Sequence, residues 1–94
     1  MVTTDEFRRV AFAQPFITYV VHLRDGRRFV VARPFSTMLY PDGEHALSYH
    51  APDESNVRGE EDEISYRVSE IDHLELRPDL ECWDFKQRRW RRSG

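Results

Sequence analysis

The sequence predicts a mainly β fold, in which a short N-terminal helix precedes a small five-stranded barrel and a basic tail ends the chain. Three observations support this prediction: a helix-start signal near the N-terminus, a long β-branched and aromatic run split by Asp25-Gly26, and several short strand-like segments between turn residues. The 94 residues suffice for one domain, and a domain of this size has a thin core. Apolar residues make up 39% of the chain, which is the composition of a folded protein.

The helix is expected over residues 4–12. Thr3 and Glu6 have the spacing of a capping box, in which the threonine hydroxyl accepts from the backbone amide of Glu6 and the carboxylate reaches back. Apolar residues then recur at helical spacing. Pro15 ends the pattern, because proline cannot continue a helix.

The run that follows is expected to form a β-hairpin. Alternate residues of a strand share a face, so the register decides which side chains are buried together. A three-residue loop at 25–27 pairs Leu23 with Phe29 and Val21 with Val31, which keeps the apolar residues of both arms on one face. A two-residue loop shifts the register by one and separates them. We therefore expect the three-residue loop with a bulge, unless both faces of the hairpin are covered.

Four further short strands are expected, at residues 36–40, 44–50, 63–68 and 72–77. The segment 51–62 is polar and acidic and is expected to be a mobile loop. A helix followed by about five short, bent antiparallel strands is typical of a small SH3-like barrel. Residues 1–79 are therefore assigned to the helix and barrel, and 80–94 to a basic, aromatic C-terminal segment. Its apolar spacing fits a helix or a strand equally well.

Charge is strongly segregated along the chain, although the net charge is only −3. Residues 1–40 carry six bases and three acids, residues 41–81 carry three bases and thirteen acids, and residues 82–94 carry five bases and one acid. The basic tail is therefore expected either to rest on the acidic segment of the same or a neighbouring subunit, or to bind a polyanion.

Two stretches carry a family resemblance. "VVHLRDGRRFVV" (20–31) resembles the first hairpin of Sm-like proteins, and "ISYRVSEIDHLEL" (64–76) resembles their second block, in which a tight turn joins two short strands. The chain is still more similar to small uncharacterised bacterial proteins with a Leu-x-Asp-Gly-Arg hairpin. Sm-like proteins form rings and bind U- or A-rich RNA. The resemblance implies that Tyr66 and Arg67 match the aromatic-basic pair of the bacterial RNA chaperone of that family, whereas Val68 stands where the chaperone has a histidine.

The tail is the other candidate for binding RNA or a protein partner. Its cations can neutralise phosphates, and its tryptophans can stack on unpaired bases. The residues concerned are Lys86, Arg88, Arg89, Trp90, Arg91 and Arg92, with Trp83 beside them.

Other candidates for chemistry are weaker. His22, His73 and Cys82 could meet at a zinc ion, but the usual ligand spacings are absent. Cys82 with His73 as base is the corresponding candidate nucleophile. The acidic run 60–63 lacks the alternating ligands of a calcium loop. No glycine-rich phosphate loop or nucleophile elbow occurs. We therefore expect no enzyme activity, catalytic residue, metal, cofactor or small-molecule substrate.

Large apolar residues exceed what so small a core can bury, so some are expected at the surface or in an interface. They are Phe12, Phe16, Phe35, Met38, Tyr40, Tyr49, Trp83, Phe85 and Trp90. The leading hypothesis is a non-enzymatic interaction or assembly module that forms a homo-oligomer, and the alternative is an Sm-like RNA-binding protein. One cysteine, no signal-like N-terminus and no membrane-length apolar run indicate a cytoplasmic protein without membrane contact.

Overall fold

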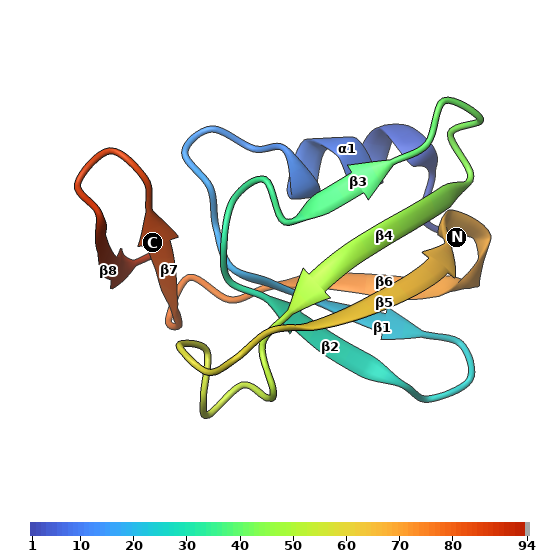
Figure 1. The fold of residues 1–94 in the computed structure, drawn as a ribbon. Helices are drawn as coiled ribbons and strands as arrows, with labels where there is room; N and C mark the ends of the chain where they lie inside the picture. Colours follow the sequence, from blue (N-terminus) through green and yellow to red (C-terminus); the bar gives the residue numbers. More distant parts are fainter. Residues whose placement is uncertain (94) are drawn as a thin grey trace.

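The computed structural model describes residues 1–93 and confirms a mainly β fold, with 42% of the chain in strands and 12% in helix (Figure 1). The elements are α1 (Thr4–Ala11), β1 (Tyr19–Leu23), β2 (Arg28–Val31), β3 (Thr37–Leu39), β4 (His45–His50), β5 (Asp62–Arg67), the 3₁₀ turn η1 (Val68–Glu70), β6 (Ile71–Leu76), β7 (Glu81–Asp84) and β8 (Arg89–Arg92). The expected strand positions after the first hairpin are close to those observed. Among the described residues, no helix is long and apolar enough to cross a membrane.

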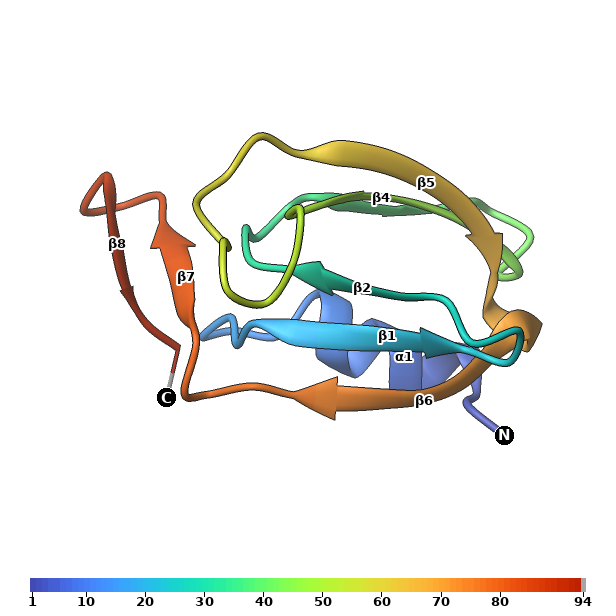
Figure 2. The same cartoon turned by 90° about the horizontal axis from the view of Figure 1, so that it is seen from below.

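The strands form three small sheets and, within residues 1–93, no closed barrel. Their orders are β2-β1-β6, β3-β4-β5 and β7-β8, with every neighbouring pair antiparallel. Figure 2 shows the first two sheets facing each other as layers. The described backbone makes one isolated bridge between these layers, from Val30 of β2 to Ala51, the residue after β4. The expected five-stranded barrel is therefore not confirmed, because one bridge does not continue the ladder from sheet to sheet.

Helix α1 closes one open side between the two layers. The Thr3 hydroxyl accepts from the amide of Glu6 at 3.1 Å, as the capping-box spacing predicts. Phe7 is fully buried and meets the ring of Tyr66 edge-on, at 6.1 Å between centroids. The Thr4 hydroxyl donates to the carbonyl of Gly43, in the β3–β4 turn, at 2.7 Å. The helix also packs against β6, so it joins both sheets to one core.

In the first hairpin the side chains lie on the predicted faces, but the two strands pair in a different register. Val21 lies opposite Phe29, whereas the sequence predicts that Val21 lies opposite Val31. Gly26 has φ 96°, and the amide of Leu23 bonds to the carbonyl of Arg27 at 2.8 Å. The loop is therefore 24–26 with glycine in the left-handed position, the common form of a three-residue hairpin loop. The predicted loop 25–27 was wrong, and each residue pairs with a partner two positions from the predicted one. Because alternate residues share a face, a shift of two leaves every side chain on the predicted face.

Both faces of this hairpin are covered, which explains the unbroken run of valines. One face lines the main core between the layers. The other face forms a second, smaller core beneath the segment 51–59. This second core consists of Val20, Val30, Ala32, Ala51 and Val57, with Leu80 and Trp90 packed against it. The segment 51–59 therefore contributes buried apolar side chains as well as acids, and Asp62, the last residue of the loop expected over 51–62, already belongs to β5.

Residues 80–93 form a β-hairpin, which decides between the two interpretations left open by the sequence. Cys82 is fully buried and belongs to the main core. The amide of Trp83 donates to the carbonyl of Ala32 at 2.9 Å. The hairpin stands at one end of the molecule, beside the two layers (Figure 1).

Candidate functional site

The basic residues of the C-terminal segment are displayed on the β7–β8 hairpin. Lys86 and Arg88 lie in its exposed loop, and Arg89 and Arg92 are the exposed first and last residues of β8. Arg91 is tied within the hairpin, with its Nε 3.2 Å from a carboxylate oxygen of Asp84. Within residues 1–93, none of these cations forms an ion pair with the acidic run 60–63. Folding the chain therefore leaves the two charged regions unpaired with each other.

The ion pair that joins the hairpin to the acidic segment has the opposite polarity from the one expected. Arg58, in the segment 51–59, forms a two-pronged pair with Glu81 of β7, at 2.9 and 2.8 Å. The hydrogen bond from this guanidinium lowers the pKa of the Glu81 carboxyl. Both residues of this pair belong to the acidic region 41–81, and within residues 1–93 no base of the tail forms an ion pair with that region, so the expectation that the basic tail rests on the acidic segment is not met in the single chain.

Trp90 is half-buried and its ring is occupied. The guanidinium carbons of Arg33 and Arg58 lie 5.0 and 5.9 Å from the Trp90 ring centroid. Trp83 meets the same ring edge-on at 5.6 Å. These are distances at which cations and aromatic rings attract one another. Trp90 therefore holds the hairpin onto the second core, and a base could stack on it only by displacing an arginine.

Tyr66 and Arg67, which the family resemblance implies as an RNA-binding pair, point in opposite directions. Tyr66 is only 4% exposed, and its ring packs edge-on against Phe29 at 5.1 Å. Arg67 is exposed beside a pocket of about 310 Å³. Strand alternation explains the division, because successive residues of β5 face the core and the solvent. In this arrangement a base could contact Arg67 but could not stack on the faces of Tyr66.

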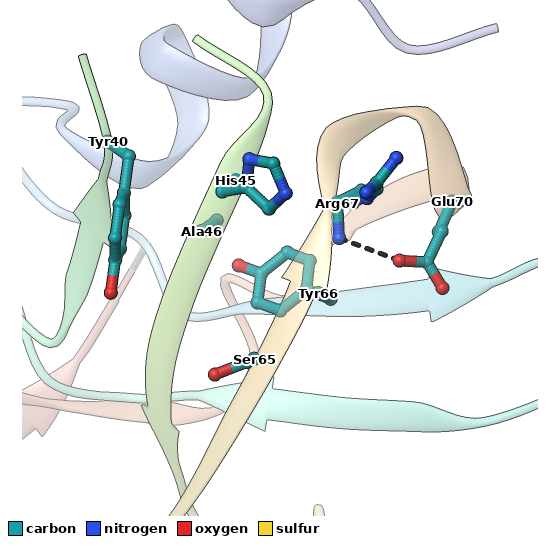
Figure 3. Close-up of a pocket in the computed structure, with 7 residues that line it drawn as sticks. All are labelled: Tyr40, His45, Ala46, Ser65, Tyr66, Arg67 and Glu70. Carbon is teal, nitrogen blue, oxygen red and sulfur yellow. Dashed lines mark hydrogen bonds between the residues drawn. The ribbon is translucent and has the colours of Figure 1, made fainter. Parts of the chain in front are cut away.

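The pocket beside Arg67 lies at one end of the β3-β4-β5 sheet (Figure 3). His45 and Arg67 are opposite each other on β4 and β5, and Tyr40 stands at the end of β3. The amide of Arg67 donates to a Glu70 carboxylate oxygen at 2.9 Å, which fixes the turn at the pocket wall. The pocket's polar side chains, among them His45 and Arg67, could bind a small anion, but Glu70 contributes a negative charge to the pocket wall.

Beneath this pocket, four buried hydroxyl groups form a chain. Tyr19 and Thr37 are 2.9 Å apart, Thr37 and Ser48 are 2.8 Å apart, and Ser48 and Tyr66 are 2.7 Å apart. Each hydroxyl can donate one bond and accept another, so the chain satisfies all four groups away from water. Burial raises the pKa of both Tyr19 and Tyr66, so both phenols stay neutral in the folded protein. The chain ties β1 to all three strands of the second sheet and is structural.

An aromatic groove of about 240 Å³ runs between the hairpin and the loops before β1 and β3. Phe35 and Phe85 form its exposed wall, with 5.5 Å between their ring centroids, and are 74% and 52% exposed. Phe35 has φ 65°, a left-handed conformation that costs energy for any residue with a Cβ. Lys86 and Arg91 lie at the rim. The sequence signal for this groove was the excess of aromatics, but their meeting across fifty residues could not be predicted from it.

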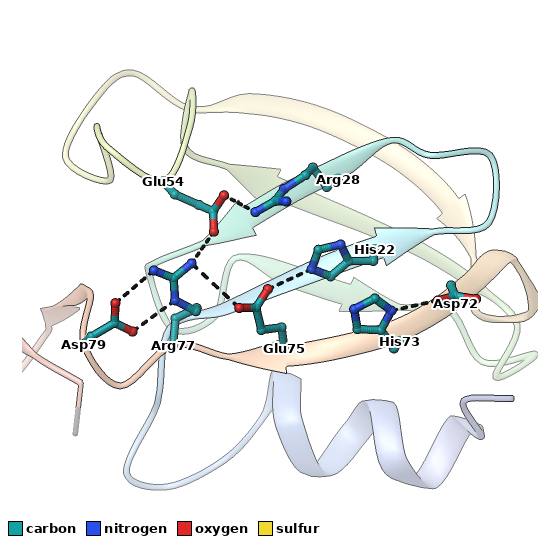
Figure 4. Close-up of polar contacts among 8 residues, drawn as sticks. All are labelled: His22, Arg28, Glu54, Asp72, His73, Glu75, Arg77 and Asp79. Atoms are coloured by element: carbon teal, nitrogen blue, oxygen red, sulfur yellow. Dashed lines mark hydrogen bonds and ion pairs between the residues drawn. The ribbon is translucent and has the colours of Figure 1, made fainter.

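The outer face of the β2-β1-β6 sheet carries a polar network centred on Arg77 (Figure 4). Arg77 forms a two-pronged pair with Asp79, at 3.0 and 2.9 Å, and also pairs with Glu54. Glu54 pairs on its other side with Arg28. The bond from Arg77 lowers the pKa of Asp79. Because Glu54 lies in the segment 51–59, this network fastens that segment over the second core.

His22 and His73 stack face to face on the same surface, with 4.1 Å between ring centroids (Figure 4). His22 Nε2 lies 2.9 Å from Glu75, and this contact lowers the pKa of the Glu75 carboxyl. Cys82 is not part of this group, because its sulfur is fully buried, 3.8 Å from the carbonyl oxygen of Phe16. Among residues 1–93, no three histidine, cysteine or acidic side chains are arranged to hold a metal ion.

Comparison with known proteins gives no assignment: no family model, no curated protein and no solved structure matches this chain.

Proposed function

We propose that this protein is a non-enzymatic assembly module that associates with further copies of itself. The observation that carries the proposal is the set of large apolar side chains left at the surface after two cores have been filled. These are Met1, Phe12, Phe35, Met38, Tyr40, Tyr49, Leu76 and Phe85. Single exposed apolar residues are ordinary, but this many on 94 residues favours a surface that is covered in the working assembly.

The polar groups support the same proposal, because most of them are engaged with one another. Arg77, Glu54 and Arg28 hold a segment in place, and the four-hydroxyl chain holds the two layers together. These groups stabilise the fold, whereas the exposed apolar side chains belong to neither core. A single buried cysteine accords with a reducing compartment, and we assign the module to the cytoplasm.

The test is the absolute mass in solution, measured by light scattering over a range of concentrations at physiological salt, after co-purified nucleic acid has been removed. A mass that is a whole multiple of 11.3 kDa and rises with concentration to a plateau is the expected result. A mass of one chain at every concentration would reject the proposal.

RNA binding through the hairpin loop is the second candidate function. The observation that favours it is the exposed set of Lys86, Arg88 and Arg89, which form no ion pair within residues 1–93, beside the exposed ring of Phe85. The two aromatic residues expected to stack on bases, Tyr66 and Trp90, are engaged elsewhere, so this candidate depends mainly on phosphate contacts.

Titration of U-rich and A-rich single strands at several salt concentrations tests the second candidate. Phosphate contacts predict an affinity that falls steeply as salt rises, and a shallower dependence after Arg88→Ala and Arg89→Ala. Alanine at Arg91 and Arg92 is the companion variant, since Arg91 is already paired with Asp84. Binding that ignores all four changes would remove the hairpin from the interaction.

A further inference from the structure

Strand β6 is an edge strand whose outer backbone groups have no strand partner within residues 1–93. The amide of Arg77 donates to the carbonyl of Thr18, on the β1 side. Backbone direction alternates along an antiparallel strand, and the β1–β6 register is regular from Tyr19 to His22. Leu74 and Leu76 therefore direct their N–H and C=O groups outward. An open edge of this kind pairs readily with another strand.

The surface beside this edge is partly apolar. A groove of about 490 Å³ lies between α1 and β6; its apolar lining is Met1, Val2, Val10, Leu74 and Leu76, and Glu6, Arg9, Asp72 and His73 add charged or polar groups. Leu76 is 49% exposed, although it belongs to β6 of the β2-β1-β6 sheet. Figure 2 shows that α1 lies over the inner face of the sheet and leaves the edge of β6 open toward solvent.

We propose that two copies of this chain pair antiparallel along β6, about a twofold axis at Leu74, to make one continuous six-stranded sheet. This proposal rests on the proposed self-association and names its interface. A twofold interface uses the same patch on both copies, so one edge strand supplies both halves.

Charge complementarity selects the register. Outward-facing backbone groups must pair with each other, which limits the twofold axis to a few positions along β6. With the axis at Leu74, His73 of each copy lies opposite Glu75 of the other, so the interface contains two pairs of complementary side chains. An axis at Glu75 would place two carboxylates opposite each other, and an axis at His73 would do the same with two imidazoles. An imidazole opposite a carboxylate can donate a hydrogen bond to it, whereas two like charges directly opposite each other weaken the pairing.

The same register covers the groove. Leu74 would meet its own copy on the inner face of the sheet, near the N-terminal residues Met1 and Val2, and Leu76 would lie opposite Asp72 of the other copy. The interface would thus remove two of the exposed apolar side chains, Met1 and Leu76, from water. The aromatic groove at the C-terminal hairpin lies at a different part of the surface and would stay open.

A charge-exchange series tests the register by sedimentation equilibrium. His73→Glu places two like-charged pairs in the interface and is expected to weaken dimerisation about tenfold or more. The double variant His73→Glu with Glu75→Lys restores opposite charges across the axis and is expected to recover dimerisation. Glu63→Lys, on the edge strand β5 of the other sheet, is the matched control and should leave the dimer unchanged.

Disulfide trapping gives an independent measurement in a Cys82→Ala background. Antiparallel hydrogen-bonded partners have Cα atoms about 5.5 Å apart, which suits a disulfide. Leu74→Cys is therefore expected to give a covalent dimer on oxidation, whereas Leu76→Cys, four residues from its own copy in this register, is not. A dimer that ignores the charge series and traps neither cysteine would overturn the β6 interface while leaving self-association standing. A monomeric wild-type protein would reject both.

Discussion

The side-chain oxygens of Ser93 and Thr18 are 3.0 Å apart, although 75 residues separate them in the sequence. Both residues are buried, at the seam between the C-terminal hairpin and β1. The Ser93 oxygen also lies 2.7 Å from the carbonyl oxygen of Leu80, and the Thr18 hydroxyl donates to the carbonyl of Glu81 at 2.7 Å. The last residues of the described chain are thus fastened to the first strand.

This seam predicts that the C-terminal segment is needed for stability. Ser93→Ala is expected to lower the free energy of unfolding by about 1–3 kcal/mol, because it leaves buried polar groups unsatisfied. Ser65→Ala, at an exposed position on β5, is the control and should change little. Urea denaturation measures both. Removal of residues 80–94 should destabilise the fold further, because Cys82 leaves the main core and Trp90 leaves the second. Unchanged unfolding of the 1–79 fragment would show that the hairpin is an appendage.

The buried hydroxyl chain predicts an order of effects. Ser48 bonds to two neighbours, whereas Tyr66 stands at one end and bonds to one. Ser48→Ala should therefore destabilise the protein more than Tyr66→Phe, which is expected to cost about 1 kcal/mol. Tyr40→Phe, at the surface, is the control. Thermal unfolding followed by circular dichroism gives the comparison, and equal losses for the two variants would mean that the chain does not act as a unit.

Stability is expected to fall at alkaline pH. Burial raises the pKa of Tyr19 and Tyr66, so the folded protein keeps both phenols protonated while the unfolded chain ionises them near pH 10. Their contribution is complete below about pH 10 and is lost as the pH rises further. Phenolate absorbance should show that Tyr19 and Tyr66 ionise only together with unfolding. Ionisation of all four tyrosines in the folded protein would contradict this.

Glu54 is expected to control the exposure of the segment 51–59. It lies between Arg28 and Arg77, and its neutral analogue glutamine would weaken both contacts. Glu54→Gln should therefore speed trypsin cleavage after Arg58 in the native protein. Glu60→Gln, an exposed change in the same part of the chain, should not. Equally fast cleavage in the wild-type protein would mean that the network does not hold the segment, in line with the mobile loop expected from its composition.

The backbone conformation of Phe35 is expected to lower the stability of the folded protein. Its backbone has φ 65°, a conformation that glycine adopts freely. Phe35→Gly should raise the free energy of unfolding by about 1 kcal/mol, since the lost contact with exposed Phe85 is worth less than the relieved strain. Arg88→Gly, at the other non-glycine residue with positive φ, is the companion variant. A loss of stability in Phe35→Gly would show that the ring supports the fold, and a gain would show that it is retained for another purpose.

Local signals were enough to predict most individual elements. The capping pair Thr3 and Glu6 located the helix, and turn residues separated strands whose positions proved nearly correct. The parity argument placed Val21 and Phe29 on one face, because parity depends only on alternation along each strand. The exact pairing required the position of Gly26 within the loop, and neither of the two loops weighed from the sequence, which paired Val21 with Val30 or with Val31, is the one observed. The candidate site was predicted less well, because strand alternation that buried Tyr66 also exposed Arg67.

By itself, the sequence determined the mainly β class of the fold, the approximate positions of the helix and the first six strands, the separation of charge and the surplus of apolar residues. These follow from spacing and composition, which act over a few residues. Tertiary structure alone decided that the second face of the valine hairpin is covered by the segment 51–59, that Cys82 enters the main core, and that β6 ends its sheet with an open edge. Each depends on contacts between residues far apart in the chain, whose formation is set by the packing of the whole molecule.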